Sequence, residues 1–237
     1  MCGRYASSRR DTDLVADLDV DDAVGDAPPP SWNVAPTQDA RVVLERRERE
    51  TAGALPRRQL RTLRWGLVPS WADDPRIGSR LINARAETLT VKPAFAAAAS
   101  RRRCLIPADG YYEWERRAGR PGTVPHFLHR PREPLWFAGV YEFWSDGRRP
   151  RDDPQRWLAT FAIVTTTASD ALGHIHDRSP LVVPPELRDA WLDPTLTEPP
   201  QVAALVAAVP DPRLSAYPVS TAVNDHRNNG AELATPV

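Results

Sequence analysis

The sequence predicts an α+β fold in which a mixed or antiparallel β-sheet, or a barrel-like core, carries short peripheral helices. Six apolar runs bounded by turn residues are dispersed along the chain, and the helical patterns between them are short and local. A regular alternation of strand and helix, typical of a doubly wound parallel sheet, is not seen in the sequence. These observations favour the α+β class.

The expected strands are runs rich in apolar and β-branched residues. They are Arg41–Leu44, Leu60–Val68, Cys104–Ile106, Leu135–Tyr141, Leu158–Thr165 and Leu214–Val219. The segment Trp144–Arg156, which lies between the fourth and fifth runs, is polar and rich in Arg, Asp and Pro. We expect it to be an exposed insertion between two strands.

The expected helices have apolar residues at helical spacing over only two or three turns. They are Asp11–Leu18, Lys92–Ser100, Pro185–Leu192 and Gln201–Val209. Pro185 stands where the first helical turn tolerates proline. The acidic and proline-rich segment Asp19–Pro30 is expected to be a surface loop.

Length and composition indicate one folded domain over residues 1–237. The chain has 237 residues, of which 41% are hydrophobic, and domains typically have ~100–200 residues. Basic and acidic residues number 31 each, so no net field draws the molecule to nucleic acid or anionic lipid. Lys92 is the only lysine; the many arginines suit phosphate binding but are equally explained by codon bias. Any anion site must therefore be local.

The first residues, MCGRYASSRR, contain no apolar stretch of the ~7–15 residues that a secretory signal needs. No run approaches the ~18–20 apolar residues of a membrane span. We therefore expect the protein to stay in the cytosol. In a reducing compartment the two cysteines, Cys2 and Cys104, are expected to be thiols.

Cys2 is the candidate reactive residue. An initiator methionine before a small residue is commonly removed, and Cys2 would then carry a free α-amine beside its thiol. The amine has a reference pKa of ~7.7–8.0 and the thiol ~8.5, so both are partly nucleophilic near neutrality. Such a 1,2-aminothiol condenses with an aldehyde to an imine, which the thiol closes to a five-membered thiazolidine. The plain alternative is an ordinary terminal cysteine.

Nine motifs occur together and in order along nearly the whole chain. They are MCGRYA at 1–6, WNVAPTQ at 32–38, RWGLVPSWADD at 64–74, INARAET at 82–88, RCLIPADGYYEW at 103–114, FAGVYEFW at 137–144, TTTAS at 165–169, IHDRSP at 175–180 and VNDHRNNG at 223–230. The set resembles the SRAP family, named for SOS-response-associated peptidase. The resemblance implies covalent shielding of abasic sites in single-stranded DNA at stalled replication forks, where replication-fork proteins would be partners. We expect a monomer that is associated with the nucleoid when bound to DNA.

Position by position, the resemblance makes Cys2 the nucleophile and Asn83, Glu113 and His176 its helpers. The Asn83 amide would hydrogen-bond the amine or the opened sugar, Glu113 would move protons, and His176 would assist ring opening. Plain alternatives are a turn residue for Asn83, a solvated edge with Glu115 for Glu113, and a surface metal site with His174 for His176. No third metal ligand is indicated, so neither a metal nor another cofactor is predicted.

The predicted DNA contacts come from the same motifs. Arg4, Arg85 and Arg178 are the phosphate-binding candidates, which would position the strand without reading its sequence. Trp71 and Trp65, with Pro36, would stack on or wedge beside the base next to the gap. Core packing is the alternative for both tryptophans, above all for Trp65, which lies in a predicted strand.

One departure from the family pattern is Ser179, which stands where the family usually has Met after the IHxR element. It puts the packing behind His176 in question. The leading function is covalent capture, with AP-lyase activity because a Schiff base at an abasic sugar promotes β-elimination. Two alternatives stay open: a thiol peptidase, whose minimal activity is removal of its own Met1, and a noncovalent single-strand binding module.

Overall fold

The computed structural model describes residues 2–46, 55–117, 119, 122–168 and 173–237, and its fold is α+β as predicted. Five strands form a closed barrel: β4 (Asp39–Arg46), β5 (Arg57–Trp65), β7 (Arg103–Ala108), β10 (Leu135–Ser145) and β11 (Trp157–Thr167). Antiparallel pairs join β5, β4, β7, β10 and β11 in that order, and a parallel pairing of Phe161 with Trp65 closes the ring. The remaining strands of this sheet are β2 (Asp22–Val24), β6 (Asn83–Arg85) and β12 (Arg178–Pro180).

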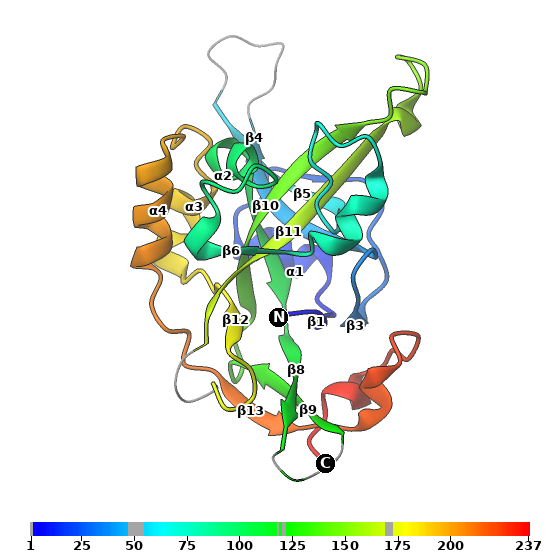
Figure 1. The fold of residues 1–237 in the computed structure, drawn as a ribbon, viewed down its shortest axis with the longest axis vertical. Coiled ribbons are helices and arrows are strands. Elements are labelled where there is room, and N and C mark those ends of the chain that lie inside the picture. The colour runs from blue at the N-terminus through cyan, green and yellow to red at the C-terminus, as the bar shows by residue number, and fades with distance from the viewer. Residues whose placement is uncertain (1, 47–54, 118, 120–121, 169–172) are drawn as a thin grey trace.

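A second sheet lies at the lower end of the molecule in Figure 1. Its five strands follow the order β13-β9-β8-β1-β3, and neighbouring strands are antiparallel. Their bounds are β1 (Tyr5–Ser7), β3 (Ser31–Val34), β8 (Gly110–Arg116), β9 (Thr123–His129) and β13 (Ser215–Pro218). Strand β1 brings the start of the chain between the two sheets, close to the middle of the molecule.

The barrel strands are apolar on both faces because both are covered. One face fills the barrel with side chains such as Val42, Leu63 and Phe161, and the other packs against helices. Within β10, Gly139 has no room for a side chain, since a Cβ there would lie 2.3 Å from Ile106 Cδ1 and 2.9 Å from Cys104 Sγ. Close packing inside the barrel thus fixes the shell on which the site is built.

Four short helices cover the barrel. They are α1 (Asp11–Asp17), α2 (Ala96–Arg101), α3 (Arg188–Leu192) and α4 (Pro199–Ala208), and Figure 1 shows the last three together on one flank. All four predicted helices are present. Helix α2 begins later than expected because Pro93 disfavours helical geometry at Lys92. None of the helices in the described ranges has the length and apolar character needed to cross a bilayer.

All six predicted strands are present. The polar segment after Trp144 is the projecting tip of the β10–β11 hairpin, although Trp144 itself is buried in β10. The expectation that Asp19–Pro30 is all loop was wrong, because β2 adds a parallel edge strand beside β5 within it. A strand of three residues, Asp-Ala-Val, is too short to show a periodic signal by which it could be recognised.

Candidate functional site

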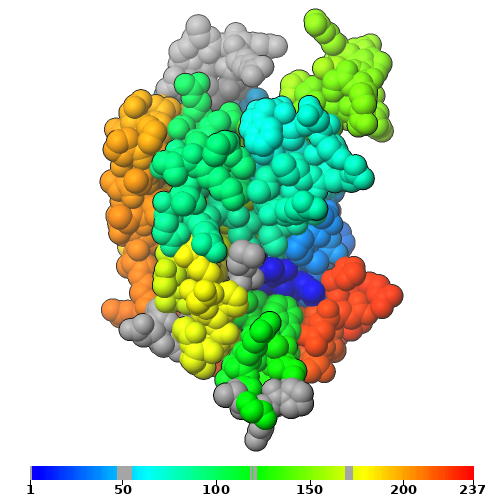
Figure 2. Space-filling model, in the orientation of Figure 1, coloured from blue at the N-terminus to red at the C-terminus, as the bar shows by residue number. Residues whose placement is uncertain are grey.

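Cys2 owes its position to the pairing of β1 with β8. Tyr5 lies opposite Tyr111 in an antiparallel ladder, so the chain preceding Tyr5 runs toward Glu113. Figure 2 shows this N-terminal segment in blue at the surface, in a notch between parts of the chain far apart in sequence. The Cys2 residue itself is buried beneath that surface. Both cysteines are free thiols, as expected.

The Cys2 thiol is protonated at neutral pH. Burial raises the pKa of this thiol well above its usual range, and the nearby Glu113 carboxylate raises it further. A hydrogen bond from the backbone N–H of Arg4 to the sulfur acts in the opposite direction and is the smaller effect. The sulfur therefore needs a proton acceptor close by before it can form a bond to carbon.

Asn83 holds the backbone of Cys2. It lies in β6, beside Ile163 of β11, and its Nδ2 donates to the Cys2 carbonyl oxygen at 2.8 Å. A carbonyl can only accept, so this bond fixes which end of the amide is the nitrogen. The Asn83 Oδ1 is buried and has no hydrogen-bond partner in the described ranges. That oxygen is an acceptor positioned beside the reactive residue.

Glu113 is a carboxyl poised to exchange protons near neutrality. It lies in β8 with only 4% of its surface exposed. Burial raises the pKa of Glu113 to about 7 because the apolar surroundings disfavour the charged form. Its electrostatic effect on the Cys2 thiol shows that the two groups are close. Glu113 is thus not the solvated edge residue of the plain alternative.

His176 comes just before β12 and lines a small pocket with Glu113, Tyr111 and Arg178. The backbone N–H of Arg178 donates to His176 Nδ1 at 3.0 Å, whereas Asp177 Oδ1 is 2.9 Å from the same nitrogen. We assign Nδ1 as the acceptor because the backbone amide is an obligatory donor, which leaves the proton on Nε2. Burial lowers the pKa of His176, so the ring is neutral at pH 7.

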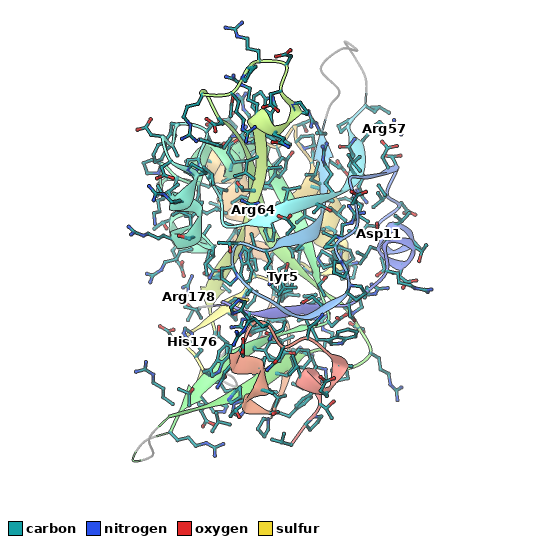
Figure 3. All side chains as sticks on the ribbon, turned by 90° about the vertical axis from the view of Figure 1, so that its right-hand side faces the viewer. Tyr5, Asp11, Arg57, Arg64, His176 and Arg178 are labelled. Carbon is teal, nitrogen blue, oxygen red and sulfur yellow. The ribbon has the colours of Figure 1, made fainter. Side chains whose placement is uncertain are left out.

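The four predicted reactive residues lie together in the structure. The three arginines predicted to bind phosphate have different environments. Arg4 Nη1 donates to Asn33 Oδ1 at 2.7 Å and to the Val223 carbonyl at 2.8 Å. Arg85 is exposed at the end of β6. Arg178 is committed to Glu87, which it contacts through both terminal nitrogens. Figure 3 shows Arg178 beside His176, on the side of the molecule where Tyr5 marks β1.

The two tryptophans differ in exposure. Trp71 is 60% exposed, and Pro36 is half-buried in the turn after β3. The expectation that Trp65 stacks on a base is wrong, because its ring is fully buried, parallel to Phe161 with the centroids 6.4 Å apart. Its Nε1 donates to the Ile82 carbonyl at 2.9 Å. Trp65 therefore supports the backbone one residue before Asn83.

The pair His174 and His176 is joined by no third ligand: within the described ranges, no three His, Cys, Asp or Glu side chains are grouped closely enough to hold a metal ion. Ser179, the departure from the family pattern, is buried in β12 opposite Thr166. Beside it, the backbone N–H of Arg178 donates to His176 Nδ1, and the Arg178 side chain donates to the Thr165 carbonyl. Met1, whose removal we expect, lies outside the described residues.

Two residues of the site were missed from the sequence. Glu87, in the INARAET block, binds Arg178. Asn33, in the WNVAPTQ block, accepts from Arg4 and donates to the carbonyls of Asp225 and Asn228. Both stand inside motifs, which was the only available signal, because their partners are between 29 and 195 residues away in the chain.

The fold and the site together define a class of protein. Its members are barrel-based α+β proteins that bury a cysteine near the start of the chain against Asn, Glu and His. The chain belongs to the SOS response associated peptidase (SRAP) family, whose model matches residues 1–226. It is 35% identical over 234 residues, 98% of both chains, to the abasic site processing protein YoqW of Bacillus subtilis. It is 33% identical to the abasic site processing protein YedK of Escherichia coli, with full coverage of both.

A solved structure of a protein from Bacteroides thetaiotaomicron has the same fold. The TM-score is 0.78 at 20% identity, and the match covers the whole of both chains. Conservation of the backbone at this low identity agrees with a fold determined by barrel closure and burial.

Proposed function

We propose that this protein captures abasic sites in single-stranded DNA through a covalent bond to Cys2. The observation that carries the proposal is the buried Cys2, whose carbonyl is held by Asn83 and whose thiol lies near a carboxyl with a pKa of about 7. The names of the relatives, which describe abasic site processing, support the same substrate. Removal of Met1, by the protein itself or by an aminopeptidase, exposes the amine.

The reaction joins two nucleophiles to one carbon. The Cys2 amine adds to the C1′ aldehyde of the opened sugar, and the carbinolamine loses water to give an imine. The thiol then adds across the C=N bond, so that the S–C bond forms and the thiol proton passes to nitrogen. The product is a thiazolidine with the mass of protein plus DNA minus one water.

Each neighbouring group has a defined task in this proposal. Neutral His176 donates its Nε2 proton to the ring oxygen of the closed sugar and so promotes opening. Ionised Glu113 takes a proton from the amine or the thiol and returns one to the leaving water. Asn83 Oδ1 accepts from the amine or from a sugar hydroxyl.

We assign the DNA contacts to motif residues whose side chains are at least partly exposed. Arg85 is proposed to bind phosphate, and Trp71 and Pro36 are proposed to stack on or wedge against a flanking base. Arg4 would contribute as a half-buried cation. Arg178 would have to leave Glu87 before it could bind a phosphate. AP-lyase activity accompanies capture when the imine undergoes β-elimination before the ring closes.

The peptidase alternative is less favoured by the site. A thiol peptidase needs a thiolate, usually formed by a neighbouring histidine. Here burial and Glu113 raise the pKa of the Cys2 thiol. The aldehyde reaction tolerates this because the amine attacks first.

The test mixes processed protein with a single-stranded oligonucleotide that carries one abasic site. Wild type should give a shifted band on a denaturing gel. Cys2→Ala should lose the stable adduct while noncovalent binding persists, and Cys2→Ser should form an unstable imine or a weaker ring. A denaturant-resistant adduct of undiminished yield in Cys2→Ala would contradict the proposal, as would peptide cleavage by a wild type that ignores the aldehyde.

A further inference from the structure

The ion pair between Glu87 and Arg178 joins two parts of the site that come from distant parts of the chain. Arg178 Nη1 donates to Glu87 Oε1 at 2.5 Å, and Nη2 donates to Oε2 at 3.0 Å. Nη2 also donates to the Thr165 carbonyl at 2.6 Å. Two parallel bonds between planar groups fix orientation as well as distance.

Strand β11 lies between the two partners. Its residue Thr165 pairs with both Arg85 of β6 and Pro180 of β12, so β6 and β12 occupy its two edges. Glu87 follows β6 in the short 3-10 helix Ala86–Thr88, and Arg178 begins β12. The Arg178 side chain therefore reaches across the end of β11 to Glu87.

Each end of this bridge is directly linked to a reactive group. Glu87 lies four residues after Asn83, which donates to the Cys2 carbonyl. Arg178 lies two residues after His176, and its own backbone N–H donates to His176 Nδ1. The strands that carry Asn83 and Arg178, β6 and β12, are each only three residues long, so few backbone hydrogen bonds hold them in place.

We propose that Glu87 is a positioning residue for the capture reaction: by clamping Arg178 across β11, it keeps Asn83 and His176 aligned with Cys2. The inference rests on the proposed function of the site and adds to it a residue that touches neither substrate nor sulfur. It also gives Arg178 a role in the architecture of the site.

Burial explains why this clamp needs a carboxylate. The Arg178 side chain is 11% exposed, whereas Glu87 is 51% exposed. A guanidinium so far removed from water is costly without a charged partner, and breaking such a pair leaves it uncompensated. Hydrogen bonding to Arg178 also lowers the pKa of the Glu87 carboxyl, so the clamp is intact at neutral pH.

The competing explanation is a gate, in which Glu87 shields Arg178 until a DNA phosphate displaces it. The two ideas predict opposite effects of Glu87→Gln and Glu87→Ala. A clamp affects the rate of adduct formation at saturating DNA and leaves the noncovalent Kd for intact single-stranded DNA unchanged. A gate tightens that Kd and increases its salt dependence, because a phosphate contact is gained.

The first measurement uses the free protein and no DNA. Long-range proton–nitrogen NMR spectra of the His176 ring, assigned with His176→Gln, report the tautomer and the titration. The charged groups that face this ring are Glu113, Asp177 and Arg178. Wild type should show the Nε2–H tautomer and a pKa below the usual range. In Glu87→Ala the tautomers should mix, and the pKa should return toward the usual range, because a displaced ring loses the burial that lowers it.

The second measurement is the adduct rate at saturating DNA. Loss of the clamp should slow it about tenfold or more, toward the ~10²-fold that misplacement by about 1 Å can cost. Glu87→Asp, which keeps the charge on a shorter side chain, should recover part of the rate. Glu133→Gln removes another exposed carboxylate paired with an arginine, Arg130 at 3.1 Å, and should leave the rate at the wild-type value.

The outcomes distinguish failure of the proposed capture function from failure of the proposed clamp. A wild type that forms no adduct refutes the capture function, while the NMR titration still tests the clamp. An unchanged His176 tautomer and pKa in folded Glu87→Ala overturns the clamp even if capture is established. A tighter Kd with an unchanged rate at saturation also overturns it, in favour of the gate.

Discussion

Asn83 Nδ2 donates a hydrogen bond of 2.8 Å to the backbone carbonyl of Cys2, joining the start of the chain to a strand on the barrel. The bond restrains the residue that we propose as nucleophile. Because the Asn83 backbone is itself supported by β11 and by Trp65, the position of Cys2 follows from the barrel core. The barrel thereby places a terminal residue, which would ordinarily be poorly ordered, beside its helpers.

Replacing Asn83 tests this restraint. Asn83→Ala removes both the donor to Cys2 and the unpaired acceptor, so adduct formation at saturating DNA should slow by about 10–100-fold, within the range known for misplaced reacting groups. Asn83→Asp removes the donor but keeps an acceptor and should be slowed similarly. Stopped-time denaturing gels give the rate, and fluorescence anisotropy with intact single-stranded DNA gives the Kd. A weaker Kd with an unchanged rate at saturating DNA would assign Asn83 to DNA binding instead.

Glu113 predicts a pH dependence of capture. Its pKa of about 7 means that the carboxylate, the form that accepts a proton, appears as the pH rises through neutrality. The rate should therefore rise between about pH 6 and 8. Glu113→Gln should lower the rate and leave only the rise due to the amine, whose reference pKa is ~7.7–8.0. Unchanged pH profiles in wild type and variant would remove Glu113 from the mechanism.

The same raised pKa predicts the effect of Glu113→Gln on stability. Its stabilising contribution is present below the unfolded pKa, ~4.3, and is lost as the pH rises through the folded value of about 7. Above pH 7 the variant should be more stable than wild type by up to ~4 kcal/mol, from 1.36 kcal/mol per pKa unit. Urea unfolding at pH 5 and pH 8 measures the difference. A difference independent of pH would show that ionised Glu113 is fully compensated in the fold.

Trp71 is the proposed base-stacking residue. Trp71→Ala should weaken noncovalent binding of single-stranded DNA by about 1–3 kcal/mol, the typical contribution of one stacked base. Trp157→Ala is a matched control, because Trp157 is 58% exposed, compared with 60% for Trp71. Anisotropy titrations at constant salt compare the two. Equal losses would indicate a general effect of removing surface tryptophan.

The sequence was sufficient to find the strands of the barrel but not its closure. Apolar runs such as Leu135–Tyr141 predicted β10, because strands covered on both faces are continuously apolar. The parallel pairing of Phe161 with Trp65 joins residues 96 positions apart, which local patterns cannot predict. Strand β8 was missed because charged residues interrupt its apolar character, and β9 because Pro125 and two histidines do so.

The candidate site was predicted from resemblance to a family, and spacing alone would not have assembled it. Three strand pairings bring the site together: β1 with β8, β6 with β11, and β12 with β11. They place Cys2, Asn83, Glu113 and His176 in one region. The short strands β1, β6 and β12 have too few residues to show a period. For the same reason the partner of Arg178 could not be predicted, and the buried environment of Trp65 became known only with the barrel.

The central claim is tested most directly by inserting one alanine between Met1 and Cys2. Processing of this variant leaves the amine on alanine and the thiol on the next residue, so a thiazolidine cannot form. Intact mass spectrometry after reaction with abasic single-stranded DNA should give, for wild type, the protein without Met1 plus DNA minus one water, stable to denaturant. The insertion variant should give no such stable product. A stable adduct of equal yield in that variant, or one in wild type that retains Met1, would contradict capture by the joined amine and thiol of Cys2.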